Sequence, residues 1–305
     1  MRNFILGNPS GRNNTLRTMD FSDELQSKII PADGATGTLL MDSGIAAERC
    51  FEELCVSDPD AVCAVHESYI ATGARLVRTN SFGANAVRLA RHGFEHRVNE
   101  INWSAAQLAK DCARGKGVYV AGSVGPLGIT AAEAKAQGID RDAVFREQIG
   151  ALLDGGVNLI LLETFTDPDE LLLALYVKQS LHHCPAVCSL AFAGDGRLPS
   201  GITLLNAFEK LRGNDADVVG MNCTDAATML RLLDETKVPE FFSAFPSAGL
   251  PQKIDGRLCY DLTPEDFAKN ALALAGCGAR LIGGCCGTTP AHVAAMVNAL
   301  PGAGA

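Results

Sequence analysis

The sequence has no long uninterrupted hydrophobic segment. None of its stretches reaches the roughly 18 uncharged apolar residues of a membrane-spanning helix. The first thirty residues are polar and mixed in charge, so they lack the apolar core of a secretory signal. Positive charge is also scarce, because 26 Lys and Arg face 35 Asp and Glu, and the net charge of −9 disfavours nucleic-acid binding. We therefore expect a cytoplasmic protein that binds neither membranes nor nucleic acids.

Tryptophan is nearly absent, whereas cysteine is abundant. Trp103 is the only tryptophan, and the chain has eleven cysteines. A disulfide framework is typical of short secreted chains, so in a cytoplasmic protein of 305 residues we expect reduced thiols, some of which serve a metal or catalysis. Hydrophobic residues make up 47% of the chain and the mean hydropathy is +0.11, which favours a large folded core.

Short apolar segments alternate with amphipathic ones along the chain. Eight of them are typical of buried strands: 29–32, 74–78, 118–122, 158–162, 186–192, 217–221, 240–245 and 279–282. Four of the intervening segments start with a capping residue and a proline, namely Asp58-Pro59, Asp167-Pro168, Thr263-Pro264 and Thr289-Pro290. This pattern predicts an α/β fold, a single-domain (β/α)8 TIM barrel over residues 29–305 with residues 1–28 as an N-terminal extension. A doubly wound open sheet is the alternative.

Polar residues and thiols follow several of these strands. In such barrels the active site lies at the carboxyl ends of the strands. The residues found there are Asp33, Gly34, Asn80, Ser81, Glu163, Cys223, Cys285 and Cys286. We therefore expect them to gather at one end of the barrel.

The adjacent pair Cys285 and Cys286 lies in a glycine-rich turn after the last strand. With Cys223 from another strand end, the pair would form a three-thiolate zinc site with one open position, as catalytic zinc requires. The alternative is that all three are apolar fillers. A different metal-dependent barrel enzyme would need His and carboxylate ligands at strand ends, and a non-enzymatic zinc module would normally add a fourth Cys or His.

Several motifs resemble the homocysteine S-methyltransferase family, which includes the homocysteine module of cobalamin-dependent methionine synthase and the betaine- and S-methylmethionine-dependent enzymes. The matching segments are 33–38 (DGATGT), 78–85 (RTNSFGAN), 121–126 (AGSVGP), 163–165 (ETF), 220–223 (GMNC) and 283–290 (GGCCGTTP). The resemblance implies a (β/α)8 barrel, one Zn²⁺ per chain on Cys223, Cys285 and Cys286, and methyl transfer to homocysteine to form methionine. No further catalytic residue is required beyond the zinc site, because zinc favours the thiolate of the substrate.

The amino-acid end of homocysteine also needs binding groups. Glu163 is our candidate for the α-ammonium group, and the alternative is a capping or ion-paired carboxylate. The backbone N–H groups of Asp33 and Gly34 are candidates for the α-carboxylate, although an ordinary turn would have the same sequence. Asn80 and Ser81 would either line the pocket or be structural. We expect His292 to lie at the surface or to cap the last helix.

One segment departs from the family pattern. Several members have Pro-Asn-Ala-Gly after the seventh strand, whereas this chain has Pro246-Ser247-Ala248-Gly249. Before homocysteine binds, Ser247 or water would then occupy the fourth zinc position.

The methyl donor is the least constrained part of the prediction. The sequence has no D-x-H-x-x-G corrinoid-binding motif, so we expect S-methylmethionine or methylcobalamin on a separate protein to supply the methyl group. A betaine-type enzyme is a weaker alternative, because Trp103 falls in an expected outer helix and cannot join an aromatic cage. A zinc methyltransferase acting on another thiol is also an alternative.

Overall fold

Eight parallel strands form a closed barrel in this computed structural model, which describes residues 21–193, 195–235, 242–250, 252–254 and 257–302. The strands lie in the order β1-β10-β7-β6-β5-β4-β3-β2. Their bounds are β1 (Ile30–Pro31), β2 (Leu76–Arg78), β3 (Tyr119–Val124), β4 (Leu159–Phe165), β5 (Ala186–Leu190), β6 (Val218–Asp225), β7 (Phe242–Ser247) and β10 (Ala279–Ile282). Ala32 bridges to Leu76, and the Asp33 N–H donates to the Leu76 carbonyl at 2.9 Å. This contact closes the barrel between β1 and β2, so the predicted (β/α)8 barrel is confirmed and the open-sheet alternative is wrong.

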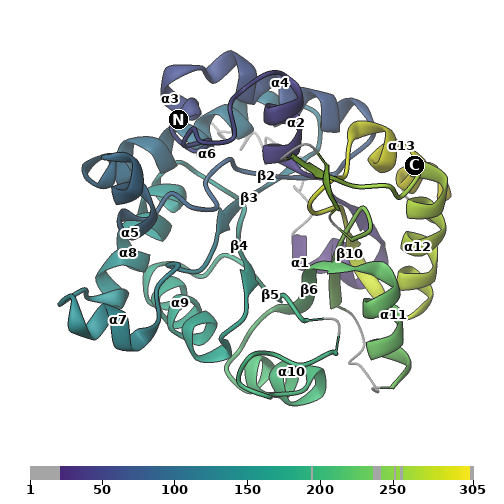
Figure 1. Cartoon of the computed structure of the whole chain (residues 1–305). Helices are drawn as coiled ribbons and strands as arrows, with labels where there is room; N and C mark the ends of the chain where they lie inside the picture. Colours follow the sequence, from purple (N-terminus) through teal and green to yellow (C-terminus); the bar gives the residue numbers. More distant parts are fainter. Residues whose placement is uncertain (1–20, 194, 236–241, 251, 255–256, 303–305) are drawn as a thin grey trace, which may run out of the picture.

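Helices surround the barrel (Figure 1). The longer ones are α4 (Pro59–Ala71), α6 (Val98–Ala113), α8 (Arg141–Asp154), α9 (Pro168–Leu181), α10 (Leu204–Arg212), α11 (Ala226–Asp234), α12 (Pro264–Gly276) and α13 (Pro290–Ala299). Shorter helices are α2 (Thr36–Asp42), α3 (Leu54–Ser57), α5 (Ala86–Leu89) and α7 (Ala131–Ala136). Four helices begin at the prolines that the sequence indicated, because proline at the first helical position has no N–H to leave unpaired.

Two apolar layers hold the fold together. The larger one lies between the strands and the surrounding helices and includes Phe145, Phe208 and Phe267. The smaller one fills the barrel interior with side chains such as Leu76 and Leu161. This inner layer ends in Cys285, with Cys223 and Cys286 packed against it. The barrel core therefore supports the thiols directly.

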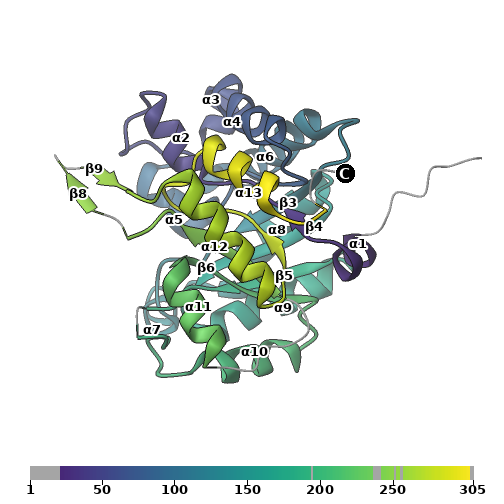
Figure 2. The same ribbon diagram turned by 90° about the vertical axis from the view of Figure 1, so that its right-hand side faces the viewer.

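The two ends of the barrel are covered differently. Helix α1 (Phe21–Ser27) lies at the amino ends of the strands, where Glu24 accepts hydrogen bonds from Arg75 and Tyr119 at 3.3 and 2.8 Å. The hairpin of β8 (Gln252–Ile254) and β9 (Arg257–Cys259) lies on the opposite side (Figure 2). The sequence did not indicate either element. Residues 1–20 of the predicted extension lie outside the described part of the chain.

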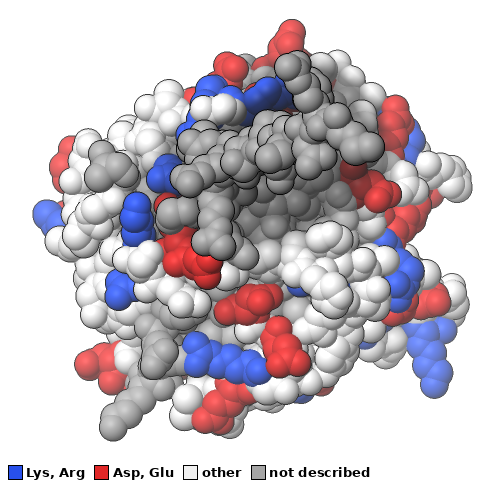
Figure 3. Space-filling model, turned by 180° about the vertical axis from the view of Figure 1, so that it is seen from behind, with Lys and Arg blue, Asp and Glu red and all other residues white. Residues whose placement is uncertain are grey.

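The described helices are all too short or too polar to cross a membrane. On the face seen from behind, acidic and basic side chains are interspersed over the coloured part of the surface (Figure 3).

Candidate active site

Three thiols from two strands meet at the carboxyl end of the barrel. Cys223 lies on β6, and Cys285 and Cys286 lie in the loop after β10. The sulfur of Cys286 is 3.6 Å from that of Cys223 and 4.0 Å from that of Cys285, and all three sulfurs lie within 4.8 Å of one another. Tetrahedral zinc with bonds of about 2.3 Å separates its sulfur ligands by about 3.8 Å. The three side chains therefore fit a zinc ion.

The electrostatics of this cluster also favour a cation. Hydrogen bonds from the thiols of Cys223 and Cys285 lower the pKa of Cys286 to about 3. The pKa values of Cys223 and Cys285 are raised instead, because their neighbours are the other thiols of the cluster. One sulfur therefore favours the thiolate, whereas repulsion between the sulfur charges disfavours ionisation of the other two. A divalent ion removes this repulsion and allows all three thiols to bind as thiolates.

Two backbone hydrogen bonds and one side-chain hydrogen bond hold the loop that carries Cys285 and Cys286. Gly284 N–H donates to the Asp33 carbonyl at 2.8 Å, and Cys285 N–H donates to the Pro246 carbonyl at 2.8 Å. The Thr288 hydroxyl donates to the Cys285 carbonyl at 2.6 Å. A Cβ atom on Gly284 would lie 2.4 Å from that hydroxyl oxygen, so this position requires glycine.

Below the thiols, a buried arginine joins two carboxylates. Arg78 donates through Nε to Asp33 at 2.7 Å and through Nη1 to Glu163 at 3.1 Å. Its Nη2 donates to the carbonyls of Gly34 and Gly284 at 2.6 and 2.8 Å. The Ser123 hydroxyl donates to the other oxygen of Glu163 at 2.5 Å. Two carboxylates and one guanidinium leave this network with one excess negative charge when all three groups are ionised.

The pKa values reflect burial of these groups. Burial raises the pKa of Asp33 from 3.8 to about 6, although the charge and hydrogen bonds of Arg78 oppose the shift. Burial also raises the pKa of Glu163, again against the charge of Arg78. Burial lowers the pKa of Arg78, but the charges of Asp33 and Glu163 outweigh it and raise the pKa overall. An additional cation at this point would stabilise both carboxylates.

The structure brings some of the expected substrate-binding groups together and leaves others occupied. Glu163 and Asp33 lie in one network with Arg78. The Asp33 N–H is used in barrel closure, so only the Gly34 N–H of that pair stays a candidate for the carboxylate. Asn80 donates to the Phe51 carbonyl at 2.6 Å, and Ser81 donates to the Ser123 carbonyl at 2.7 Å. The side-chain donors of Asn80 and Ser81 are therefore occupied by hydrogen bonds to backbone carbonyls within the protein.

Two residues of the site were missed in the sequence. Arg78 ends an apolar strand two residues after the inward-facing Leu76, and this spacing was a signal that it points into the barrel. Tyr260 packs over Gly287, where an added Cβ would lie 2.2 Å from the ring, and its hydroxyl helps to lower the pKa of Cys286. No local pattern distinguished Tyr260.

Of the two predicted alternatives for His292, capping of the last helix is confirmed, because the residue is buried and does not lie at the surface. Its side chain is buried because Nε2 faces the Leu262 carbonyl at 2.8 Å. Its Nδ1 accepts from the Thr289 N–H at 3.2 Å, which caps α13 as the sequence indicated.

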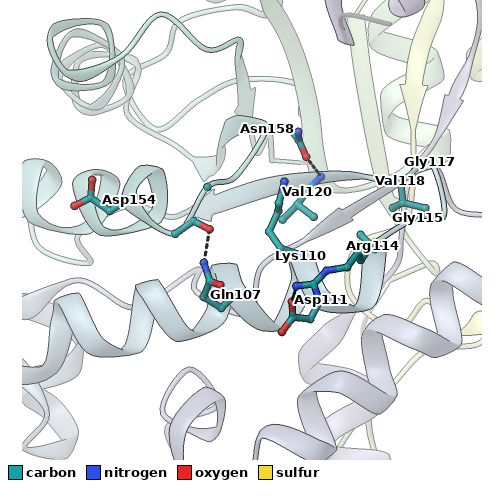
Figure 4. A pocket seen from close by; sticks show the side chains of 13 residues that line it. Gln107, Lys110, Asp111, Arg114, Gly115, Gly117, Val118, Val120, Asp154 and Asn158 are labelled. Atoms are coloured by element: carbon teal, nitrogen blue, oxygen red, sulfur yellow. Dashed lines mark hydrogen bonds and ion pairs between the residues drawn. The ribbon is translucent and has the colours of Figure 1, made fainter. Parts of the chain in front are cut away.

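A separate pocket of about 560 Å³ lies near the amino ends of β3 and β4 (Figure 4). Gln107 donates to the Gly155 carbonyl at 2.9 Å, and Asn158 accepts from the Val120 N–H at 2.9 Å. In these barrels this end serves stability rather than catalysis. Gln107 thus joins α6 to the turn after α8, and Asn158 joins the segment before β4 to β3.

Comparisons with known proteins identify the family of the chain. The family model for homocysteine S-methyltransferase matches residues 31–300. Methionine synthase of Mycobacterium tuberculosis is 32% identical over 310 residues, which cover 92% of this chain and 25% of that protein. The chain therefore spans about a quarter of the length of this curated relative.

Solved structures show the same relationship. The homocysteine methyltransferase MmuM of Escherichia coli in its metallated form superposes with a TM-score of 0.72 at 25% identity, over 89% of this chain and 96% of that one. Its oxidised form gives a TM-score of 0.72 at 26% identity, over 93% and 99% of the two chains. The chain therefore belongs to the homocysteine S-methyltransferase family and is a methyltransferase.

Proposed function

We propose that this protein forms methionine by transferring a methyl group to homocysteine whose thiolate is bound to zinc at Cys223, Cys285 and Cys286. The observation that carries the proposal is the spacing of the three sulfurs, which is that of ligands around one tetrahedral ion. Three protein ligands leave a fourth position for a substrate. Bound zinc would keep the homocysteine sulfur deprotonated at neutral pH, where a free thiol is mostly protonated.

The buried carboxylates provide the second half of the substrate site. Glu163 and Asp33 share one guanidinium, so the α-ammonium group of an amino acid would neutralise the excess negative charge. Ser123 and Arg78 hold Glu163 through its two oxygens, which fixes its orientation before the substrate arrives. The sulfur of an aminothiol would thus bind the zinc held by the three cysteines, and its ammonium nitrogen would bind Glu163.

For the methyl donor we propose S-methylmethionine or methylcobalamin on a separate protein. Trp103 is half exposed on α6, outside the barrel, so it cannot contribute to a cage for betaine at the thiol end. A homocysteine thiolate held by zinc would attack a methyl group on any good leaving group that reaches it, so the open end of the barrel would decide which donor is used. We also propose a reducing compartment such as the cytoplasm, because metal-binding thiols must stay reduced.

A donor panel tests this proposal. Methionine formation from homocysteine is measured with S-methylmethionine, free methylcobalamin and betaine, together with the zinc content of each preparation. We expect one zinc per chain and turnover with one of the first two donors. Cys223→Ala should lose both zinc and turnover, whereas Cys277→Ala, at an exposed cysteine, should keep both. Full turnover in the metal-free protein, or turnover with betaine alone, would contradict the proposal.

A further inference from the structure

Two residues next to the proposed substrate groups have left-handed backbone conformations. Thr164, which follows Glu163, has a φ of 64°, and Cys223 has a φ of 55°. This region is unfavourable for residues other than glycine, and a β-branched residue such as threonine is a particular exception there. Such conformations persist only when the surrounding structure holds them.

The side chain of Asn222 holds Thr164 directly, and its backbone precedes Cys223. Its Oδ1 accepts a hydrogen bond from the Thr164 N–H at 2.9 Å, and its Nδ2 donates to the Thr164 hydroxyl at 2.6 Å. Asn222 is fully buried and directly precedes Cys223. Both polar ends of one amide are therefore used to bind a single residue on another strand.

This contact joins two strands that are not neighbours in the sheet. β5 lies between β4 and β6, so Asn222 reaches across the end of β5. The strand register shifts at this point on both sides, between Leu162 and Phe165 and between Asn222 and Asp225. The two irregular strand ends carry Glu163 and Cys223. The amide thus fixes the position of the carboxylate relative to the sulfur.

We propose that Asn222 is a positioning residue that sets the spacing between Glu163 and Cys223 and thereby selects homocysteine over the shorter aminothiol cysteine. The inference rests on the proposed function, in which these two residues meet opposite ends of the substrate. An aminothiol one methylene shorter cannot reach both ends of a rigid site. Discrimination by one methylene group is worth roughly 10–200-fold in kcat/KM. A site that is free to contract loses this discrimination.

Three variants test the proposal. Asn222→Ala removes the whole contact, and Thr164→Val removes the hydroxyl that Asn222 binds while keeping the side-chain shape. Asn102→Ala is the control, because Asn102 is also fully buried and donates twice, to the carbonyls of Ala84 and Val98 on the outer layer. For each protein we would measure kcat/KM for homocysteine and for cysteine, and the zinc dissociation constant by chelator competition without substrate.

We expect the homocysteine-to-cysteine ratio to fall at least about tenfold in Asn222→Ala and to fall in the same direction in Thr164→Val. Zinc affinity should fall about 10–100-fold in Asn222→Ala, as for other residues that orient a ligand. Asn102→Ala should keep the wild-type ratio and affinity. An unchanged ratio in folded Thr164→Val would overturn the inference, even if Asn222→Ala does not fold. A wild-type protein without zinc or turnover would instead overturn the proposed function.

Discussion

Arg78 binds Asp33 twice, because its backbone N–H donates to Oδ2 at 2.8 Å and its Nε donates to Oδ1 at 2.7 Å. Both side chains are buried inside the barrel. The same guanidinium reaches Glu163 and the carbonyl of Gly284, next to the thiol loop. One residue therefore connects the proposed ammonium site to the proposed metal site.

Removal of this guanidinium should lower the free energy of unfolding. Arg78→Met leaves Asp33 and Glu163 buried without their cation, and we expect a loss of about 3–5 kcal/mol in the free energy of unfolding. Arg146→Met is the control, because Arg146 pairs with Asp142 in solvent and should cost at most about 1 kcal/mol. Urea unfolding of both variants measures the difference. Equal losses in the two variants would show that the buried network stabilises the fold no more than an ion pair in solvent.

The raised pKa of Asp33 predicts a pH dependence of stability. Burial raises this pKa from 3.8 to about 6, so the folded protein holds the proton more tightly than the unfolded chain. The resulting stabilisation is complete below pH 4 and is lost as the pH rises through 6, a change of about 3 kcal/mol. The free energy of unfolding should therefore fall from pH 4 to 7 more steeply in the wild type than in Asp33→Asn. Parallel curves would mean that Asp33 does not titrate in this range.

Loss of the charge on Glu163 should weaken homocysteine binding. Glu163→Gln keeps the shape of the side chain. From kcat/KM for homocysteine we expect the transition state to be bound more weakly by roughly 2–4 kcal/mol, with zinc content unchanged. Glu170→Gln is a matched control, because Glu170 is similarly buried but accepts from the Leu127 N–H outside the barrel interior. If both variants keep wild-type kinetics, Glu163 has only a structural role.

The barrel could be predicted because its strands and helices have strong local patterns. Each strand is a short apolar segment, and α4, α9, α12 and α13 start at prolines that follow capping residues. The three thiols could be predicted for a related reason. Residues that follow parallel strands meet at the same end of a barrel. Cys223 and Cys285 could therefore be expected to lie close together although they are far apart in the sequence.

The parts of the site that were missed depend on contacts between distant segments. Thr164, with its left-handed backbone conformation, is hydrogen-bonded by Asn222, which lies 58 residues further along the chain. The role of Arg78 depends on two carboxylates from other strands, and neither contact leaves a local pattern. His292 was expected to lie at the surface or to cap the last helix, because it lies in the first turn of that helix, and capping is what the structure has. It is buried because the Leu262 carbonyl packs against that turn.

The central claim is that homocysteine sulfur completes a zinc site made by Cys223, Cys285 and Cys286. X-ray absorption at the zinc edge of the purified protein counts the sulfur atoms around the ion directly. We predict three sulfur neighbours at about 2.3 Å without substrate, together with one lighter atom, and four sulfur neighbours after homocysteine is added. A sulfur count that stays at three with saturating homocysteine would contradict this account.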